Sequence, residues 1–250
     1  MKKWSVLLVC VFILAAGFVS QAQAKIEVEG DTYVGIWDKY LWRGFNLSGS
    51  RPTLQGGIDL TAGGWTLSTW HNWQLSSGGG FDSGELNETD IILTYAFDAS
   101  ELVSMTVGNI WYSLDNEQFG VSEDTNELFA TATLNTLLAP TLKISWDWDA
   151  AEEDGLFYSF DVSHSFDLSQ WAPNIALNLG ALVSYNQHAD GTVGDYAGWH
   201  NYELSTSLDC ALTDQLTISP IFIFSSPISS AAKDAIDTET VAALNLTFTF

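Results

Sequence analysis

The sequence predicts an all-β fold class: a transmembrane, antiparallel, up-and-down β-barrel of about 12 strands. Three observations point to it. Apolar and polar residues alternate along most of the chain, and aromatic residues gather near the ends of the alternating runs. No segment after the first 24 residues approaches the roughly 18 uninterrupted apolar residues of a membrane-spanning helix. With 11 Trp, 14 Phe and 8 Tyr, the chain has far more aromatic surface than a disordered acidic protein.

The first 24 residues have the three-part pattern of a secretory signal peptide. Lys2 and Lys3 precede an apolar run from residue 4 to residue 19, and Ala22-Gln23-Ala24 supplies a small-x-small cleavage site. We therefore expect the chain to be exported and cleaved after Ala24. A single barrel domain should then cover residues 25–250, since no linker or second domain is visible in the sequence.

Charge and cysteine content narrow the function classes. The chain has 31 acidic residues against 8 basic ones, and two of those bases lie in the predicted signal peptide. A nucleic-acid partner is not expected, because binding to phosphates requires a basic surface. Cleavage would remove Cys10 and leave Cys210 alone, so no internal disulfide is expected and Cys210 should be a small packing residue.

Alternation with a period of two places each strand. The clearest run is TDIILTYAF, residues 89–97, in which Ile, Leu, Tyr and Phe share one face and polar residues share the other. This period is typical of strands with one apolar face. The expected strands are approximately 30–38, 53–62, 65–75, 88–97, 101–111, 126–135, 141–149, 156–166, 174–185, 201–210, 215–225 and 239–250.

The connections between these strands alternate between short and long. The expected short turns are 62–64, 98–100, 136–140, 167–173 and 211–214. The expected longer connections, rich in Gly, Ser and acidic residues, are 40–52, 76–87, 112–125, 150–155, 186–200 and 226–238. An even strand number with this alternation is typical of bacterial outer-membrane barrels, which have short periplasmic turns and long outer loops.

A soluble exported β-sandwich would also alternate, but three features favour the barrel. The faces opposite the apolar ones carry Ser, Thr, Asn, Asp and Gly rather than a second hydrophobic core. The last strand ends LNLTFTF, and a terminal aromatic such as Phe250 resembles the signal read by the barrel-assembly machinery. Trp and Tyr lie near strand ends, as interfacial girdles against lipid and lipopolysaccharide require. These girdle candidates are Trp65, Trp73, Tyr95, Trp111, Trp146, Trp148, Tyr185 and Tyr202.

The alternation also predicts which side chains line the inside of the barrel. If Val34 and Ile36 face lipid, the residues that alternate with them along the strand face the lumen. A Lys or Arg on the lipid face costs about 2–4 kcal/mol at the midplane, so charged strand residues are assigned to the inside. The candidate lumen or constriction residues are Lys39, Arg43, Asp90, Glu127, Asp147, Asp149 and Asp161.

The segment DKYLWRGFNLSGSR, residues 38–51, gathers three of the scarce basic residues in one place. We predict that Arg43 projects inward near the outer end of the first strand, opposite carboxylates such as Asp147, Asp149 and Asp161. Two roles stay open for it. Arg43 either pairs with a lumen carboxylate and pins the first strand, or borders the pore and sets its ion preference.

The residues on either side of Arg43 carry their own expectations. Trp42 should fall on the lipid-facing side at the headgroup level, where an amphipathic ring is favoured. Gly44 should let the chain bend out of the strand, because a residue without Cβ tolerates positive φ.

The stretch GDTYVGIWDKYLWRGFNLS, residues 30–48, resembles the first-strand motif of the TorF-type porins, a proteobacterial family of outer-membrane barrels. In that family an aromatic-x-Arg-Gly is followed by a hydrophobic and a polar residue, and Trp42-Arg43-Gly44-Phe45-Asn46 matches this pattern. The family's usual Gln-Ser is replaced here by Leu47-Ser48. The resemblance implies an outer-membrane barrel with a pore, and it brings no catalytic residues and no established substrate.

Enzymatic and metal-binding roles find little support. His188, Asp190 and His200 share one predicted loop, but no tight pair of ligands is present. Ser163 and His164 are neighbours and therefore lie on opposite faces of a strand, so they cannot form a dyad. The acidic run Glu152-Glu153-Asp154 lacks the spacing of a calcium loop. No catalytic residue, metal site or cofactor is expected, and the chain is not expected to be an enzyme.

Two functions fit these features. The first is a pore for passive diffusion of small hydrophilic solutes, preferring cations or small neutral or zwitterionic solutes because carboxylates dominate. Barrels of about 8 strands are filled by side chains, and barrels of 16–18 strands leave an open channel. A barrel of twelve strands is intermediate, so the side chains that line its lumen should decide which solutes pass. The second is a non-conducting scaffold or surface-binding barrel, which an inward-folded outer loop would favour.

Overall fold

The computed structural model describes residues 27–78, 81–114, 124–149 and 155–250. The predicted signal peptide with its cleavage site lies outside the described residues, as does the acidic run Glu152-Glu153-Asp154. No helix within the described residues is long and apolar enough to cross a membrane.

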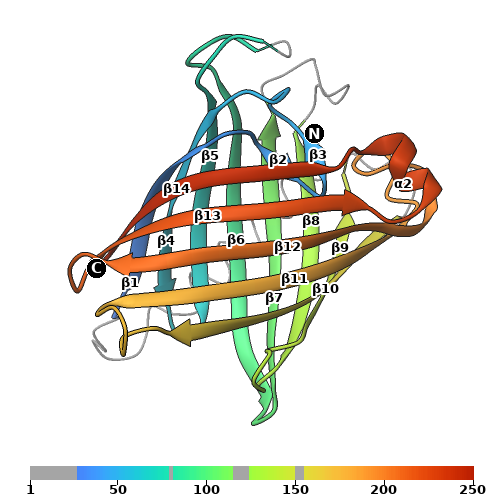
Figure 1. Ribbon diagram of the computed structural model, residues 1–250. Helices are drawn as coiled ribbons and strands as arrows, with labels where there is room; N and C mark the ends of the chain where they lie inside the picture. The colour runs from blue at the N-terminus through green and yellow to red at the C-terminus, as the bar shows by residue number, and fades with distance from the viewer. Residues whose placement is uncertain (1–26, 79–80, 115–123, 150–154) are drawn as a thin grey trace, which may run out of the picture.

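Twelve antiparallel strands form one closed barrel, as predicted. Each wall strand pairs with its neighbours along the chain, and the first pairs with the last (Figure 1). The wall strands are β1 (Glu29–Trp37), β4 (Thr53–Ala62), β5 (Trp65–Gln74), β6 (Leu86–Ser100), β7 (Val103–Leu114), β8 (Thr125–Leu134), β9 (Thr141–Asp147), β10 (Leu156–Asp167), β11 (Ile175–Gln187), β12 (Ala197–Ala211), β13 (Leu216–Pro227) and β14 (Glu239–Thr249).

The seam between β1 and β14 closes the sheet. Their register runs from Asp31 opposite Thr249 to Trp37 opposite Ala243. Beyond the last strand residue, the Phe250 amide donates to the Gly30 carbonyl at 2.9 Å, and the Gly30 amide donates to the Phe250 carbonyl at 3.1 Å. Closure leaves the wall without an open edge, so every wall strand has a hydrogen-bonded neighbour on both sides.

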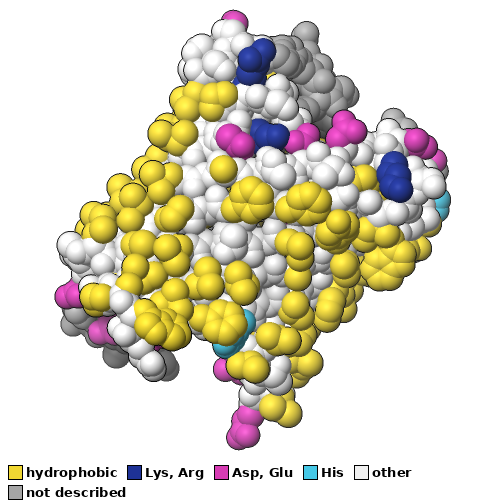
Figure 2. Space-filling view, viewed as in Figure 1, with side chains coloured by type: hydrophobic (Ala, Val, Ile, Leu, Met, Phe, Trp, Pro, Cys, Tyr) yellow, Lys and Arg dark blue, Asp and Glu magenta, His cyan; other side chains and the backbone are white. Residues whose placement is uncertain are grey.

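The outer face of the barrel is apolar over its middle. Figure 2 shows hydrophobic side chains covering the wall in this view, with acidic and basic side chains toward the two ends. Leu244, Leu246 and Phe248 of the last strand, and Phe250 directly after it, are all exposed on this face, as the alternation predicted. Aromatic pairs mark the strand ends, such as Trp65 with Tyr95, whose ring centroids are 4.8 Å apart. Such a belt fits the hydrocarbon of a bilayer.

The two ends of the barrel differ. One end, which we call the turn end, contains the start of β1, the end of β14 and the short connections. The other end, the loop end, contains the longer connections, including a six-residue helix, α2 (Ser230–Ala235), that the sequence did not predict. The Ser229 side chain caps α2 by accepting from the Ala232 amide at 3.1 Å.

The first long connection does not extend outward from the loop end as a surface loop. Residues 38–52, which we call the inward segment, fold into the barrel and form a small hairpin of β2 (Leu41–Trp42) and β3 (Phe45–Asn46). In Figure 1 this hairpin overlaps the wall strands, and the contacts of Arg43 with Glu127 and Phe157 place it inside the barrel. The inward segment therefore occupies part of the barrel interior.

Candidate pore constriction

The hairpin of the inward segment turns at Arg43 and Gly44. Trp42 pairs with Phe45, so these two residues form a two-residue loop. Their φ angles are +49° and +83°, and positive φ at both central positions is the requirement of a type I′ turn. Gly44 adopts this conformation without strain, as expected, whereas Arg43 holds a left-handed conformation that is uncommon for a residue with a Cβ. The contacts of Arg43 must therefore stabilise it.

Those contacts surround the guanidinium. Arg43 forms an ion pair with Glu127 of β8, and the side chains are only 11% and 2% exposed. The Arg43 Cζ lies 4.4 Å from the ring centroid of Trp42 and 4.4 Å from that of Phe157 on β10. Glu127 has a second, more distant basic partner in Lys143 of β9, whose Nζ lies 4.0 Å from Glu127 Oε1. A buried cation is thus matched by a carboxylate and two aromatic faces.

A histidine holds the backbone of the turn. His200 Nε2 donates to the Arg43 carbonyl at 2.7 Å, because a carbonyl can only accept. Nδ1 of the neutral ring is then the acceptor, and it receives the Tyr196 hydroxyl. The His200 ring also stacks on Phe45, with centroids 5.8 Å apart, and meets the edge of Phe157 at 5.6 Å. β12 therefore fixes both the turn and its aromatic neighbours.

The rest of the inward segment is tied to other strands. Lys39 Nζ lies 2.7 Å from Glu239 Oε2 at the start of β14. The Tyr40 hydroxyl donates to Glu88 Oε1 on β6 at 3.2 Å, and Gln74 Nε2 on β5 donates to the Ser48 carbonyl at 3.3 Å. Burial, with Glu88 beside it, raises the pKa of the Tyr40 phenol well above its usual value, so the phenol stays a donor. Contacts on β5, β6, β8, β10, β12 and β14 hold the segment across the lumen.

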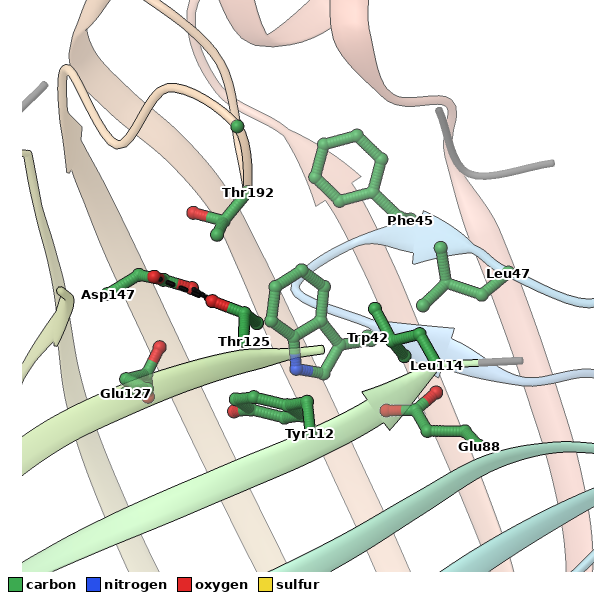
Figure 3. Close-up of a pocket in the computed structure, with 11 residues that line it drawn as sticks. Trp42, Phe45, Leu47, Glu88, Tyr112, Leu114, Thr125, Glu127, Asp147 and Thr192 are labelled. Atoms are coloured by element: carbon green, nitrogen blue, oxygen red, sulfur yellow. Dashed lines mark hydrogen bonds between the residues drawn. The ribbon is translucent and has the colours of Figure 1, made fainter. Parts of the chain in front are cut away.

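Two cavities flank this segment. The first, of about 200 Å³, is shown in Figure 3, where the hairpin, β6, β7, β8 and the loop before β12 surround it. The second, of about 240 Å³, lies between residues 40–42 and the strands β1, β4, β5, β6 and β13. Trp42 lines both cavities. The first is lined by Trp42, Phe45, Leu47, Glu88, Tyr112, Leu114, Thr125, Glu127, Asp147, Gly191 and Thr192. The second is lined by Trp37, Tyr40, Leu41, Trp42, Gln55, Trp70, Asp90 and Ile223.

Most of the candidate lumen residues occupy inward positions of the wall. Asp90 is 7% exposed and Asp147 is 6% exposed, and each lines one of the two cavities. The Thr125 hydroxyl donates to Asp147 at 2.8 Å. Asp161 lies on the same face of β10 as Phe157, four residues or about 13 Å further toward the turn end. The structure therefore gathers Arg43 and Glu127 and leaves Asp161 apart.

Three expectations around Arg43 were wrong. Its carboxylate partner is Glu127, not Asp147, Asp149 or Asp161. Asp149 follows the end of β9, is exposed, and accepts from Asn126 Nδ2 at 3.2 Å. Asn126 shares the outward face of β8 with the exposed Leu128, so Asp149 does not line the lumen. Trp42 lies inside the barrel rather than in the headgroup layer, because the chain turns inward after Trp37.

Phe157 and His200 were not assigned to this site from the sequence. Phe157 was overlooked because it is an apolar residue at an inward position, next to the apolar residues of the outer face of β10. His200 was assigned to a loop, but it lies in β12. His188, which was expected in the same loop, has its Nδ1 atom 2.7 Å from Asp195 Oδ1. In the part of the chain that the structure describes, no group of three His, Cys, Asp or Glu side chains could hold a metal ion.

No protein-family model and no curated protein matches the chain, so the resemblance to TorF-type porins stays a prediction. Solved structures do match. The KdgM porin is 13% identical, with 90% of this chain and 99% of that chain covered and a TM-score of 0.54. The NanC porin is 12% identical, with 88% and 98% covered and a TM-score of 0.54. An outer membrane channel from Pseudomonas putida F1 is 12% identical, with 92% and 100% covered and a TM-score of 0.51. At these identities the likeness concerns the fold alone: the chain has the barrel fold of outer-membrane porins.

Proposed function

We propose that the chain forms a channel in the bacterial outer membrane for passive diffusion of small hydrophilic solutes. The closed barrel with its apolar outer belt supports a membrane location, and the matched structures that share this fold are porins or channels. In this proposal lipid and lipopolysaccharide contact the outer face and the loop end. The barrel-assembly machinery recognises the terminal strand with Phe250.

The charge of the lumen wall supports a preference for cations or for small neutral or zwitterionic solutes. Within the described residues three bases of the barrel interior pair with carboxylates: Lys39 with Glu239, and both Arg43 and Lys143 with Glu127. Many inward carboxylates are left over, so the lumen has a negative potential that attracts cations. The inward carboxylates of the wall strands include Asp31, Asp59, Glu88, Asp90, Glu127, Asp147, Asp161, Glu203, Asp209 and Glu239.

Planar-bilayer recording of the purified mature protein tests this proposal. Under a potassium chloride gradient across the bilayer, the reversal potential should take the sign of a cation-preferring channel. Raising the salt concentration should weaken the preference, because mobile ions screen the lumen carboxylates. A reversal potential of the opposite sign would overturn the proposed selectivity.

The second function, a non-conducting scaffold or surface-binding barrel, is favoured by one observation: the inward segment contacts six wall strands across the lumen. The register offers a clean test, because Trp37 pairs directly with Thr53. A two-residue Asn-Gly turn can therefore replace residues 38–52 and join β1 to β4 as a simple hairpin. If the intact barrel is closed to ions and this variant conducts, the segment is a plug and the scaffold function gains support. If both conduct, the segment narrows an open channel.

A further inference from the structure

The second cavity is lined by a buried carboxylate with one oxygen that accepts no hydrogen bond. Asp90 is 7% exposed, and its Oδ1 has no hydrogen-bond partner among the described residues. Glu88 lies two residues away on the same face of β6, and its side chain interacts with the Asp90 carboxyl group, so the two form an acidic pair beside the cavity. Buried carboxylates are stabilised by hydrogen bonds or by a cation, and Asp90 has no basic neighbour among the residues that line this cavity.

Aromatic rings make up much of the wall around Asp90. Trp70 lies directly opposite Asp90 in the register of β5 and β6, which brings their Cβ atoms to about 5 Å. Tyr40 stands next to Trp70, with ring centroids 5.2 Å apart. Trp37 and Trp42 complete the lining from β1 and β2. Four aromatic residues from three separate parts of the chain thus line the cavity that Asp90 also lines.

Rings around a carboxylate select a particular kind of ligand. The negative faces of Trp and Tyr attract a cation, most strongly one that is weakly hydrated and apolar on its surface, such as an alkylated ammonium. A hydrated metal ion would need several oxygen ligands, whereas this lining offers only Asp90 and Gln55 besides the Tyr40 hydroxyl. A neutral sugar could stack on the rings but would leave the charge of Asp90 unmatched.

We propose that the second cavity is a binding site for a small organic cation of the alkylammonium class. Trp37, Tyr40, Trp42 and Trp70 form an aromatic cage around the ammonium group, and Asp90 supplies the counter-charge. The volume of about 240 Å³ is below the roughly 300–1,000 Å³ of sites for drug-sized ligands, so the ligand is a small one.

The cavity lies inside the barrel near the loop end. Asp90, Trp70 and Ile223 each lie four residues inside the loop-end termini of their strands, Leu86, Gln74 and Pro227. The site is therefore within the barrel, beside the hairpin that narrows the lumen. This inference rests on the proposed channel function and names a class of solute that the channel would select.

Calorimetric titration of the purified barrel in detergent tests the site directly. Choline chloride is the probe, 3,3-dimethyl-1-butanol is its neutral counterpart of the same shape, and sodium chloride controls for ionic strength. Choline should bind, and the neutral alcohol should bind at least about tenfold more weakly because it has no charge for the cage and Asp90 to recognise. Equal binding of the two compounds, or no binding of choline, would overturn the site.

Two variants and one matched control locate the binding. Asp90→Asn and Trp70→Leu should each weaken choline binding by about tenfold or more. Asp209→Asn removes the same charge from a lumen carboxylate that lies on β12 and does not line the cavity, so it should leave choline binding unchanged. Heat-dependent migration on gels identifies the variants that form closed barrels, and only these are compared. If folded Asp90→Asn binds choline as tightly as the parent, the cage is not the site.

Bilayer conductance separates this inference from the proposed function. A barrel that conducts potassium with cation preference but does not bind choline would retain the channel function and lose the alkylammonium site. A barrel that binds choline through Asp90 but conducts no ions would retain the site and lose the channel function. Block of the potassium current by choline, relieved in Asp90→Asn, is the expected result when both hold.

Discussion

Arg43 and Glu127 form an ion pair inside the barrel, although 84 residues separate them in the sequence. The pair joins the tip of the inward hairpin to β8, and the guanidinium lies between the rings of Trp42 and Phe157. Removing one partner of such a buried pair costs about 3–5 kcal/mol, because the other charge is left without compensation. This pair is therefore the strongest candidate for the contact that keeps the hairpin in the lumen.

The first prediction concerns Arg43→Gln. The substitution leaves Glu127 buried with only Lys143 nearby, at 4.0 Å. We expect the free energy for opening of the inward segment to fall by about 3–5 kcal/mol, up to the full stability of the segment. Hydrogen exchange of the peptide covering residues 38–52 measures this opening. Cation selectivity should also rise, since the lumen loses a positive charge.

A double variant and a control separate the two roles of Arg43. Arg43→Gln with Glu127→Gln removes both charges and should recover part of the lost protection. Lys143→Gln should cost less than about 1 kcal/mol, because Lys143 is 32% exposed and farther from Glu127. Unchanged exchange together with changed selectivity would show that Arg43 borders the pore without pinning the hairpin.

The second prediction concerns His200→Phe. A phenyl ring keeps the stacking against Phe45 but removes the donor to the Arg43 carbonyl and the acceptor for the Tyr196 hydroxyl. Leaving these groups unpaired should lower the free energy for opening of the inward segment by about 1–3 kcal/mol. His164→Phe is the control, since His164 is partly buried on the outer face of β10 and bonds the Leu137 carbonyl outside the lumen. Equal exchange in the two variants would mean that His200 does not hold the turn.

The strands were predictable from the sequence, because the side chains of each strand face lipid on one side and the lumen on the other. Apolar and polar residues therefore alternate along every strand. The predicted and observed bounds agree within a few residues for most strands. Errors arose where a strand ended early. β9 ends at Asp147, so the alternation that assigned Asp149 to the lumen no longer applied there.

The inward hairpin was not predictable in the same way. The contacts that hold it, to Glu127, His200 and Glu239, come from residues far along the chain and leave no local pattern. Trp42 was placed in lipid by continuing the alternation of β1 beyond its end at Trp37. The local signal that was present is Arg43-Gly44 between two aromatics, since Gly is favoured at the second position of a two-residue hairpin turn.

The third prediction concerns the last residue. Phe250 makes two backbone hydrogen bonds with Gly30 at the seam and exposes its ring on the outer face. Phe250→Ala retains the backbone bonds and removes only the ring, so a several-fold loss of assembled barrel in the outer membrane would indicate recognition of the ring during assembly. Phe222→Ala is the control, because Phe222 is a similarly exposed Phe within β13. Equal yields of the two variants would refute a special role for Phe250.

The fourth prediction concerns Gly44→Ala, with Gly84→Ala as its matched control. The two glycines have nearly the same φ, +83° and +86°, so an added Cβ produces a similar backbone strain at both, about 1–2 kcal/mol. A Cβ at Gly84 would meet no atom within 4 Å, whereas a Cβ at Gly44 would lie 2.5 Å from Ile236 Cδ1. Gly44→Ala should therefore expose the inward segment to hydrogen exchange far more than strain alone explains. Adding Ile236→Val deletes the clashing Cδ1 atom and should restore protection toward the level set by strain. If Gly44→Ala behaves like Gly84→Ala in the exchange of residues 38–52, the hairpin does not pack against the chain around Ile236, and the inward position of the segment would have to be reconsidered.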